Sequence, residues 1–325
     1  MVLAILGGSL LCALLALSLV IPRLRAAAVV GQDVHKKGRP EVPEMGGLVI
    51  LIGFGAGLLL ALAMMSFFHL FVFANMLLLV AALSTILLAG LIGILDDLLG
   101  MSQWAKALLP IFAALPLMAV RAGHTWMWIP FLGRVNWWIF YPLVLVPLGV
   151  TVAANAVNML AGFNGLEVGL GIVAIGSLSI LAAALQETTA LIILLSGLGA
   201  LLAVIYYNWY PARLLVGDVG TLSIGAIIAT AVIVGNFETA GVIVMIPYAI
   251  EFLFKAMHRF PTGGEGTAGQ LGEDGRLYCP ATGPVGLGQL LMKLFGGLHE
   301  RTLVLILIGI EAVFGVLAIA LYLWI

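Results

Sequence analysis

Charged residues are scarce in this chain. Asp, Glu, Lys and Arg make up 9% of its 325 residues, whereas hydrophobic residues make up 63%. An average soluble domain is about 25% charged. A chain with so little charge cannot cover itself with a water-facing surface, which argues against a soluble protein and predicts that lipid surrounds most of it. The net charge of −1 gives no indication of a nucleic-acid partner.

Cysteine is nearly absent as well. Cys12 lies in the first apolar run and Cys279 in a polar segment, so a disulfide framework is not expected. No group of Cys and His has the spacing of a zinc site. Residues 2–21 are apolar and are followed, not preceded, by Arg23 and Arg25. This order predicts a retained first span with its N-terminus outside, and not a cleaved signal peptide.

Long apolar runs dominate what remains. A helix needs about 20 apolar residues to cross the hydrocarbon core. The sequence therefore predicts an all-α polytopic membrane protein, one integral domain over 1–325, with about ten transmembrane helices and both termini outside. The expected spans are 2–21, 46–66, 71–95, 104–120, 138–157, 166–185, 188–206, 215–235, 239–257 and 302–324.

Lys and Arg assign a side to the loops between these spans. Of the 14 Lys and Arg residues, only Arg121 and Arg134 fall on the set of connections that includes 121–137. The other twelve lie on or beside the opposite set, which the positive-inside rule identifies as cytoplasmic. That set includes the glycine-rich segment 258–301, between the ninth and tenth spans. Its end, 285–298, has leucines at helical spacing and predicts a short interfacial helix.

Polar groups gather on this predicted cytoplasmic side. Asp96 and Asp97 end the third span, and Lys106 begins the next helix. Two adjacent carboxylates at a membrane boundary repel each other, and such a pair is retained where a cation offsets the charge. An ordinary solvated helix end is the alternative. Asp218 opens the eighth span in a Gly-Asp-Val-Gly turn, where simple helix capping is the alternative.

Amide side chains add to the same side. Asn155 and Asn158 share a helix face, and Asn164 precedes a tight turn. Their oxygens suit Mg²⁺, and their N–H groups suit a sugar or uracil. His258 and Arg259 follow the ninth span, where they either bind a substrate or anchor the helix at the headgroups.

The shared location of these groups favours one chemistry. Hard oxygen ligands beside Lys and Arg are what Mg²⁺-assisted phosphoryl transfer requires. A transporter is the alternative class, because Glu251 and Glu311 lie within predicted spans. However, transporters place their sites near the middle of the membrane, whereas most of these polar groups lie at the ends of spans.

Five stretches make the sequence resemble a known family, the polyprenyl-phosphate N-acetylhexosamine-1-phosphate transferases. It is most similar to the eukaryotic and archaeal branch, which uses dolichyl phosphate. The bacterial peptidoglycan branch has a histidine-triplet loop that this sequence lacks. The stretches are KKGRPEVPE (36–44), DDLLGMSQWAKALLP (96–110), NAVNMLAGFNGLE (155–167), YNWYPARLLVGD (207–218) and KLFGGLHER (293–301).

The resemblance implies roles for particular residues. Asn158 and Asp218 resemble the Mg²⁺ ligands, while Asp96, Asp97 and Lys106 resemble the catalytic groups beside the phosphates. The remaining matches imply substrate binding. Met257 stands where the family's Arg-His-Arg pattern has its first arginine, so one phosphate contact must come from elsewhere, with Arg276 or Arg301 as candidates. The implied substrate-binding residues are Glu44, Asn155, Gly162, Asn164, His258, Arg259, Arg276 and Arg301.

The implied reaction transfers N-acetylglucosamine-1-phosphate from UDP-N-acetylglucosamine to a dolichyl-type phosphate, with Mg²⁺, or Mn²⁺ in its place, as cofactor. Another UDP-N-acetylhexosamine or an undecaprenyl-phosphate acceptor would give the same chemistry. The expected location is the plasma membrane of a prokaryote or the endoplasmic reticulum of a eukaryote, and a second copy of the chain is a candidate partner. Direct displacement and a covalent intermediate on one Asp both remain open.

Overall fold

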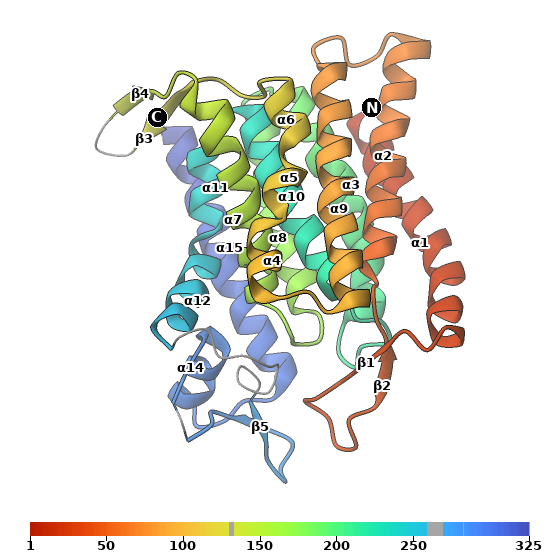
Figure 1. Ribbon diagram of the computed structural model, residues 1–325, viewed down its shortest axis with the longest axis vertical. Helices are drawn as coiled ribbons and strands as arrows, with labels where there is room; N and C mark the ends of the chain where they lie inside the picture. The colour runs from red at the N-terminus through yellow and green to blue at the C-terminus, as the bar shows by residue number, and fades with distance from the viewer. Residues whose placement is uncertain (130–132, 259–268, 282, 325) are drawn as a thin grey trace.

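A bundle of long helices forms the body of the molecule in the computed structural model, which describes residues 1–129, 133–258, 269–281 and 283–324 (Figure 1). Within this described part, eight helical segments are long and apolar enough to cross a membrane, which confirms an integral membrane protein. They are α1 (Val2–Ala26), α2 (Gly47–Phe68), α3 (Met76–Leu99), the π-helical turn η1 (Tyr141–Leu145) with α7 (Val146–Met159), α8 (Leu166–Ala184), α9 (Thr188–Asn208), α10 (Gly217–Gly235) and α15 (Glu300–Trp324).

The fourth expected span, 104–120, is not one helix. It is divided into α4 (Gln103–Leu108), α5 (Pro110–Ala113) and α6 (Leu115–Ala119). Pro110 and Pro116 lie at the starts of the second and third pieces. Proline has no N–H to donate and its ring clashes with the preceding turn, which explains both breaks. The three pieces still follow one another along the bundle (Figure 1).

The ninth expected span, 239–257, is bent. It consists of α11 (Glu238–Val244) and α12 (Ile246–Met257), whose axes differ by 57°. Pro247 lies in the first turn of α12 and accounts for the bend. Of the ten expected spans, eight are long segments in the described residues and a ninth is this bent pair; the broken run α4–α6 also passes along the bundle, and both termini lie at the same end (Figure 1).

Helix α10 is the centre of the bundle, where it contacts α3, α7 and α9. Small residues allow this close packing. A Cβ atom added to Gly93 of α3 would lie 2.4 Å from the Cα of Val219, and one added to Gly47 of α2 would lie 2.1 Å from the backbone N of Gly220. Because α3 and α10 approach so closely, the end of α3 lies against the start of α10.

The termini and the longest connections lie at opposite ends of the bundle (Figure 1). The end away from the termini carries two hairpins, β1 (Val30–Gln32) with β2 (Glu41–Pro43), and β5 (Gln270–Leu271) with β6 (Leu277–Tyr278). The short helix expected within 285–298 is present there as α14 (Leu287–Leu294), while its place at the membrane interface stays a prediction. A third hairpin, β3 (Trp126–Ile129) with β4 (Gly133–Asn136), lies at the other end. None of these three hairpins was predicted from the sequence.

Candidate active site

A cavity of about 420 Å³ opens at the end of the bundle that carries β1 and β2. Its walls combine the segment around β1 and β2, the end of α7, the turn before α8 and the start of α10. It is lined by Gln32, Asp33, Val34, His35, Glu44, Asn158, Ala161, Gly162, Phe163, Asn164, Glu167, Asn208, Leu215, Val216, Gly217, Asp218 and Thr221.

Asp97, in the last turn of α3, caps the start of α10. Its Oδ1 accepts a hydrogen bond from the backbone N–H of Asp218 (2.8 Å), and its Oδ2 accepts one from Val219 (3.1 Å). The first N–H groups of a helix have no partner within it and carry partial positive charge, so a carboxylate is favourable there. Gly217 has a φ of +67°, and a Cβ atom at this position would lie 2.5 Å from Asp97 Oδ2. Asp97 thus fixes the position of Asp218.

Lys106 of α4 joins two carboxylates. Its Nζ lies 2.5 Å from Asp96 Oδ2 and 3.0 Å from Asp218 Oδ2. Asp96 Oδ1 also accepts a hydrogen bond from the backbone N–H of Met101 (2.9 Å), which ties the end of α3 to the loop before α4. We call Asp96, Asp97, Lys106 and Asp218 the helix wall. One ammonium group serves two acids there, and Asp97 adds a third negative charge.

Asp218 of the helix wall, together with Asn158, offers ligands suited to Mg²⁺. Asp218 and Asn158, from α10 and α7, both line the cavity. A carboxylate and an amide oxygen are the hard donors that Mg²⁺ takes, usually together with water and substrate phosphate oxygens. The residues present therefore fit the ion that the sequence predicts.

A second group of polar residues lies beside the cavity, and three of its four members line it. We call Asp33, His35, Asn164 and Glu300 the loop wall; all four are buried. Asn164 connects the two acids, because its Nδ2 donates to Asp33 Oδ2 (2.9 Å) and its backbone N–H donates to Glu300 Oε1 (2.8 Å). Lys36 forms an ion pair with Asp33.

Ring stacking and burial both fix the side chain of His35. The imidazole stacks on the ring of Phe163, with centroids 4.6 Å apart. Burial lowers the pKa of His35 from 6.5 to about 4, although the negative charge of Asp33 acts in the opposite direction. The imidazole is consequently neutral at physiological pH.

Glu44 and Gly162 complete the cavity surface that the sequence analysis expected. Burial raises the pKa of the Glu44 carboxyl, and the negative charge of Asp97 raises it further. Gly162 has a φ of +113°, which favours glycine, and its backbone N–H donates to Glu167 Oε1 (2.7 Å).

Known proteins resemble this chain over most of its length. The family model described as "Glycosyl transferase family 4" matches residues 78–236, which include all four residues of the helix wall. A protein of Saccharolobus solfataricus is 38% identical over 93% of this chain and 91% of its own length. The chain belongs to this glycosyl transferase family. The Saccharolobus relative is named, provisionally, UDP-N-acetylglucosamine–dolichyl-phosphate N-acetylglucosaminephosphotransferase.

Two further relatives have the same name as the Saccharolobus protein. One, named provisionally as well, is from Sulfolobus acidocaldarius and is 35% identical over 92% of this chain and 90% of its own length. The other is from Dictyostelium discoideum and is 30% identical over 72% of this chain and 66% of its own length. The family resemblance seen in the sequence is thereby confirmed.

Two of the residues expected at the site, Asn155 and His258, do not line the cavity, and a third, Arg259, is not among the described residues. Asn155 donates from Nδ2 to the backbone oxygens of Thr151 (2.9 Å) and Ala107 (3.3 Å), and it is not among the cavity-lining residues. His258 is exposed, and its Nδ1 lies 2.8 Å from the oxygen of Phe254. Arg259 falls outside the described residues.

The two candidate replacements for the missing arginine differ from each other. Arg276 is exposed, with its Nε 3.7 Å from Asp274 Oδ2. Arg301 follows Glu300 and lies with its Cζ 5.7 Å from the ring centroid of Tyr210, a ring that Lys36 also approaches, at 4.8 Å. Arg301 is therefore connected to the loop wall.

Neither of the two carboxylates that suggested a transport pathway is among the cavity-lining residues. Glu251 pairs with Lys255 (3.2 Å) and accepts the backbone N–H of Leu287 (2.6 Å), so it ties α12 to α14. Glu311 is fully buried within α15 and is not among the cavity-lining residues, and neither of its carboxyl oxygens has a hydrogen-bond partner among the described residues.

Sequence reasoning missed Asp33, His35 and Glu300. Asp33 and His35 lie just before the stretch KKGRPEVPE, and Glu300 lies within KLFGGLHER, so these residues adjoin or belong to two of the five stretches that carry the resemblance. The one signal in the sequence that could have identified them was an acid and a histidine, Asp33 and His35, next to the stretch KKGRPEVPE. Nothing in the spacing indicated that Glu300 would lie against them.

Proposed function

We propose that this chain transfers N-acetylglucosamine-1-phosphate from UDP-N-acetylglucosamine to a dolichyl-type polyprenyl phosphate, forming a lipid-pyrophosphate-linked sugar and releasing UMP. The observation that carries the proposal is Lys106 held between Asp96 and Asp218 at a cavity where Asn158 offers a further oxygen ligand. The names of the three relatives support the choice of donor and acceptor.

The proposed reaction needs no general base, because every bond that forms or breaks is accounted for by the two substrates. An oxygen of the lipid phosphate forms a bond to the sugar-proximal phosphorus of the donor, and the bond from that phosphorus to the bridging oxygen breaks. The electron pair leaves with UMP. A phosphate monoester has a second pKa near 6, so it is largely dianionic at neutral pH and has no proton to lose. What the site must supply is relief of repulsion between two anions.

Lys106 supplies part of that relief. Its ammonium group is held in place by Asp96 and Asp218, so it requires little reorganisation when a phosphate approaches. Asn158 and Asp218 would hold Mg²⁺, which when bound neutralises charge on the phosphate oxygens. Asp97 is a positioning residue that acts through the start of α10.

A covalent intermediate on Asp97 has less support. Both of its oxygens accept backbone N–H bonds, and a nucleophile would have to give up one of them. Asp96 is similarly engaged by Met101 and Lys106. The contacts of both acids favour direct displacement.

The same proposal covers sidedness and the other substrate contacts. Placing the cavity end in the cytoplasm puts both termini outside and gives the site access to nucleotide sugars. Glu44, Gly162 and Asn164 would contact the donor from the cavity wall. Contacts with a phosphate or a sugar stay predictions for His258, Arg259, Arg276 and Arg301. A contact with the donor stays a prediction for Asn155.

A donor and acceptor panel tests the proposal. Purified full-length protein is supplied with Mg²⁺, dolichyl or undecaprenyl phosphate and a set of UDP-sugars, and UMP release is measured. We expect release with UDP-N-acetylglucosamine that depends on the lipid phosphate and stops when Mg²⁺ is chelated. Preference for another UDP-N-acetylhexosamine would correct the donor, and no release with any donor would remove the proposal.

A further inference from the structure

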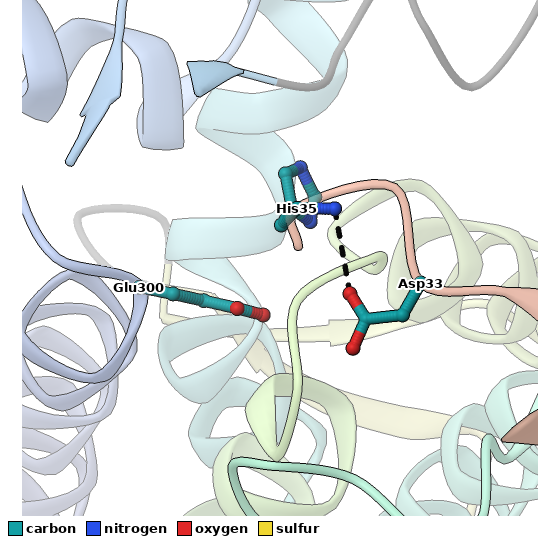
Figure 2. Close-up of side chains that lie close together, drawn as sticks. All are labelled: Asp33, His35 and Glu300. Atoms are coloured by element: carbon teal, nitrogen blue, oxygen red, sulfur yellow. Dashed lines mark hydrogen bonds between the residues drawn. The ribbon is translucent and has the colours of Figure 1, made fainter. Parts of the chain in front are cut away.

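Three buried side chains of the loop wall point toward one another (Figure 2). Asp33 and His35 belong to the connection between β1 and β2, whereas Glu300 begins α15. One ligand atom from each residue lies within 4.8 Å of those of the other two. Asp33 is 4% exposed, His35 6% and Glu300 5%, so all three are shielded from bulk water.

Two polar atoms of this group have no hydrogen-bond partner among the described residues. They are His35 Nε2 and Glu300 Oε2, and both are buried. Leaving a buried acceptor unpaired costs about 1–3 kcal/mol, and more when the group is charged. Lys36 pairs with Asp33 and so offsets one carboxylate, but Glu300 contributes a second. The cluster therefore has unused electron-pair donors and a deficit of positive charge.

The surrounding contacts hold these donors in place. Asn164 donates one hydrogen bond to Asp33 and another to Glu300, so it orients both carboxylates. Stacking on Phe163 holds the imidazole of His35. The dashed line in Figure 2 marks the backbone N–H of His35, which lies 3.4 Å from Asp33 Oδ1. Such surrounding hydrogen bonds and packing are how proteins orient metal ligands.

We propose that Asp33, His35 and Glu300 bind a divalent transition-metal ion, Zn²⁺ or Mn²⁺, at a site separate from the one that Asn158 and Asp218 form. An imidazole with two carboxylates suits these ions, whereas Mg²⁺ prefers oxygen ligands alone. His35 Nε2 has no hydrogen-bond partner among the described residues, which leaves this ring nitrogen available to a metal ion. The proposal is independent of which reaction the cavity supports.

A bound ion would connect segments far apart in the sequence. Asp33 and His35 bring in the connection between β1 and β2, Glu300 brings in α15, and Asn164 links both to the turn before α8. The ion would fix the part of the cavity wall to which Asp33, His35 and Asn164 contribute, which is built from loops.

Metal retention tests the proposal without using activity. Full-length protein carrying a tag without histidine is stripped with a chelator and then dialysed against Zn²⁺ or Mn²⁺ in a large excess of Mg²⁺. We expect the unaltered chain to retain about one ion, and we expect His35→Gln and Glu300→Gln to lose at least about tenfold in affinity. In Glu300→Gln the amide oxygen can still accept the N–H of Asn164.

His299→Gln is the matched control, because His299 is the neighbour of Glu300 but is exposed, with Nδ1 3.2 Å from the oxygen of Gly275. It should retain the ion. Equal retention by all four proteins, or no retention by the unaltered chain, would overturn the proposal. X-ray absorption of the ion on the unaltered chain keeps the test decisive if a variant does not fold. Scattering from imidazole is expected, and its absence would contradict the site.

Discussion

The helix wall and the loop wall both bury acids beside one cavity, but they neutralise those acids differently. In the helix wall, Asp97 accepts backbone N–H groups of α10, and Lys106 pairs with both Asp96 and Asp218. In the loop wall, Lys36 pairs with Asp33, yet Glu300 Oε2 and His35 Nε2 have no partner in the described residues. Each acid of the helix wall has a partner from a neighbouring helix or loop, whereas the loop wall leaves one carboxylate oxygen and one imidazole nitrogen without a partner among the described residues.

The largest effect should come from Asp218, the residue that joins the helix wall to the cavity. Asp218→Asn removes a charge that pairs with Lys106 and offers an oxygen to Mg²⁺, so UMP release should fall about 10²–10³-fold. The fold should persist, because Asp97 caps α10 through backbone groups that the change leaves in place.

The matched control is Glu187→Gln, in the turn between α8 and α9 at the end of the bundle away from the cavity. It should leave UMP release unchanged. An Asp218→Asn protein that keeps full activity and an unchanged Mg²⁺ requirement would remove Asp218 from the site.

Acid should weaken the loop wall through His35. Its pKa is about 4 in the folded protein and 6.5 when unperturbed, so between these values the unfolded chain binds more protons. The free energy of unfolding should therefore fall as pH decreases from 6.5 toward 4, by about 2–3 kcal/mol from this group. Chelated protein is used, so that no bound ion contributes.

Thermal unfolding at pH 7 and pH 5 measures this effect in the unaltered chain and in His35→Gln. The groups that face His35 are Asp33, Lys36 and Glu300, and their contributions are largely common to both proteins. The variant should show the smaller change in unfolding temperature. Identical changes would mean that His35 is not held neutral by burial.

A smaller effect is expected at Asp97, the cap of the helix wall. Asp97→Asn keeps one acceptor oxygen and loses the other, which should lower the free energy of unfolding by about 1 kcal/mol. UMP release should drop about tenfold as Asp218 becomes less well placed, but turnover should continue. Parallel unfolding and rate measurements check both expectations. Complete loss of turnover in a folded variant would favour the covalent scheme.

The smallest effect should come from Tyr210, at the edge of the loop wall. Its ring is approached by the cations of Lys36 and Arg301. Such contacts contribute about 0.5–1 kcal/mol at exposed sites. Tyr210→Leu should raise the KM for the UDP-sugar about twofold to fivefold, whereas Tyr210→Phe, which keeps the ring, should leave it near the original value. A rise with Phe as large as with Leu would assign the effect to the hydroxyl.

The sequence predicted the helix wall well, for a physical reason. Apolar length defines spans, and carboxylates at span ends are exceptional enough to be noticed, so Asp96, Asp97 and Asp218 could be placed on one side. The pairing of Lys106 with two of them needed the structure, because it depends on how closely α3 and α10 approach at Gly93.

The loop wall could not be predicted in the same way. Glu300 lies in a different part of the chain from Asp33 and His35, and spacing along the sequence carries no information about contacts made by irregular loops. The interruptions of the fourth and ninth spans were visible, in contrast, as Pro110, Pro116 and Pro247. Hydropathy averages over such residues, which is why the runs read as continuous.

Transfer of a sugar phosphate, as opposed to a bare sugar, is the central claim, and the fate of one phosphorus atom tests it. Full-length protein is given UDP-N-acetylglucosamine labelled at the sugar-proximal phosphorus, with Mg²⁺ and dolichyl phosphate, and lipid and nucleotide products are separated. The account predicts label in the lipid fraction and unlabelled UMP. Label that leaves as UDP, with none in the lipid, would contradict it.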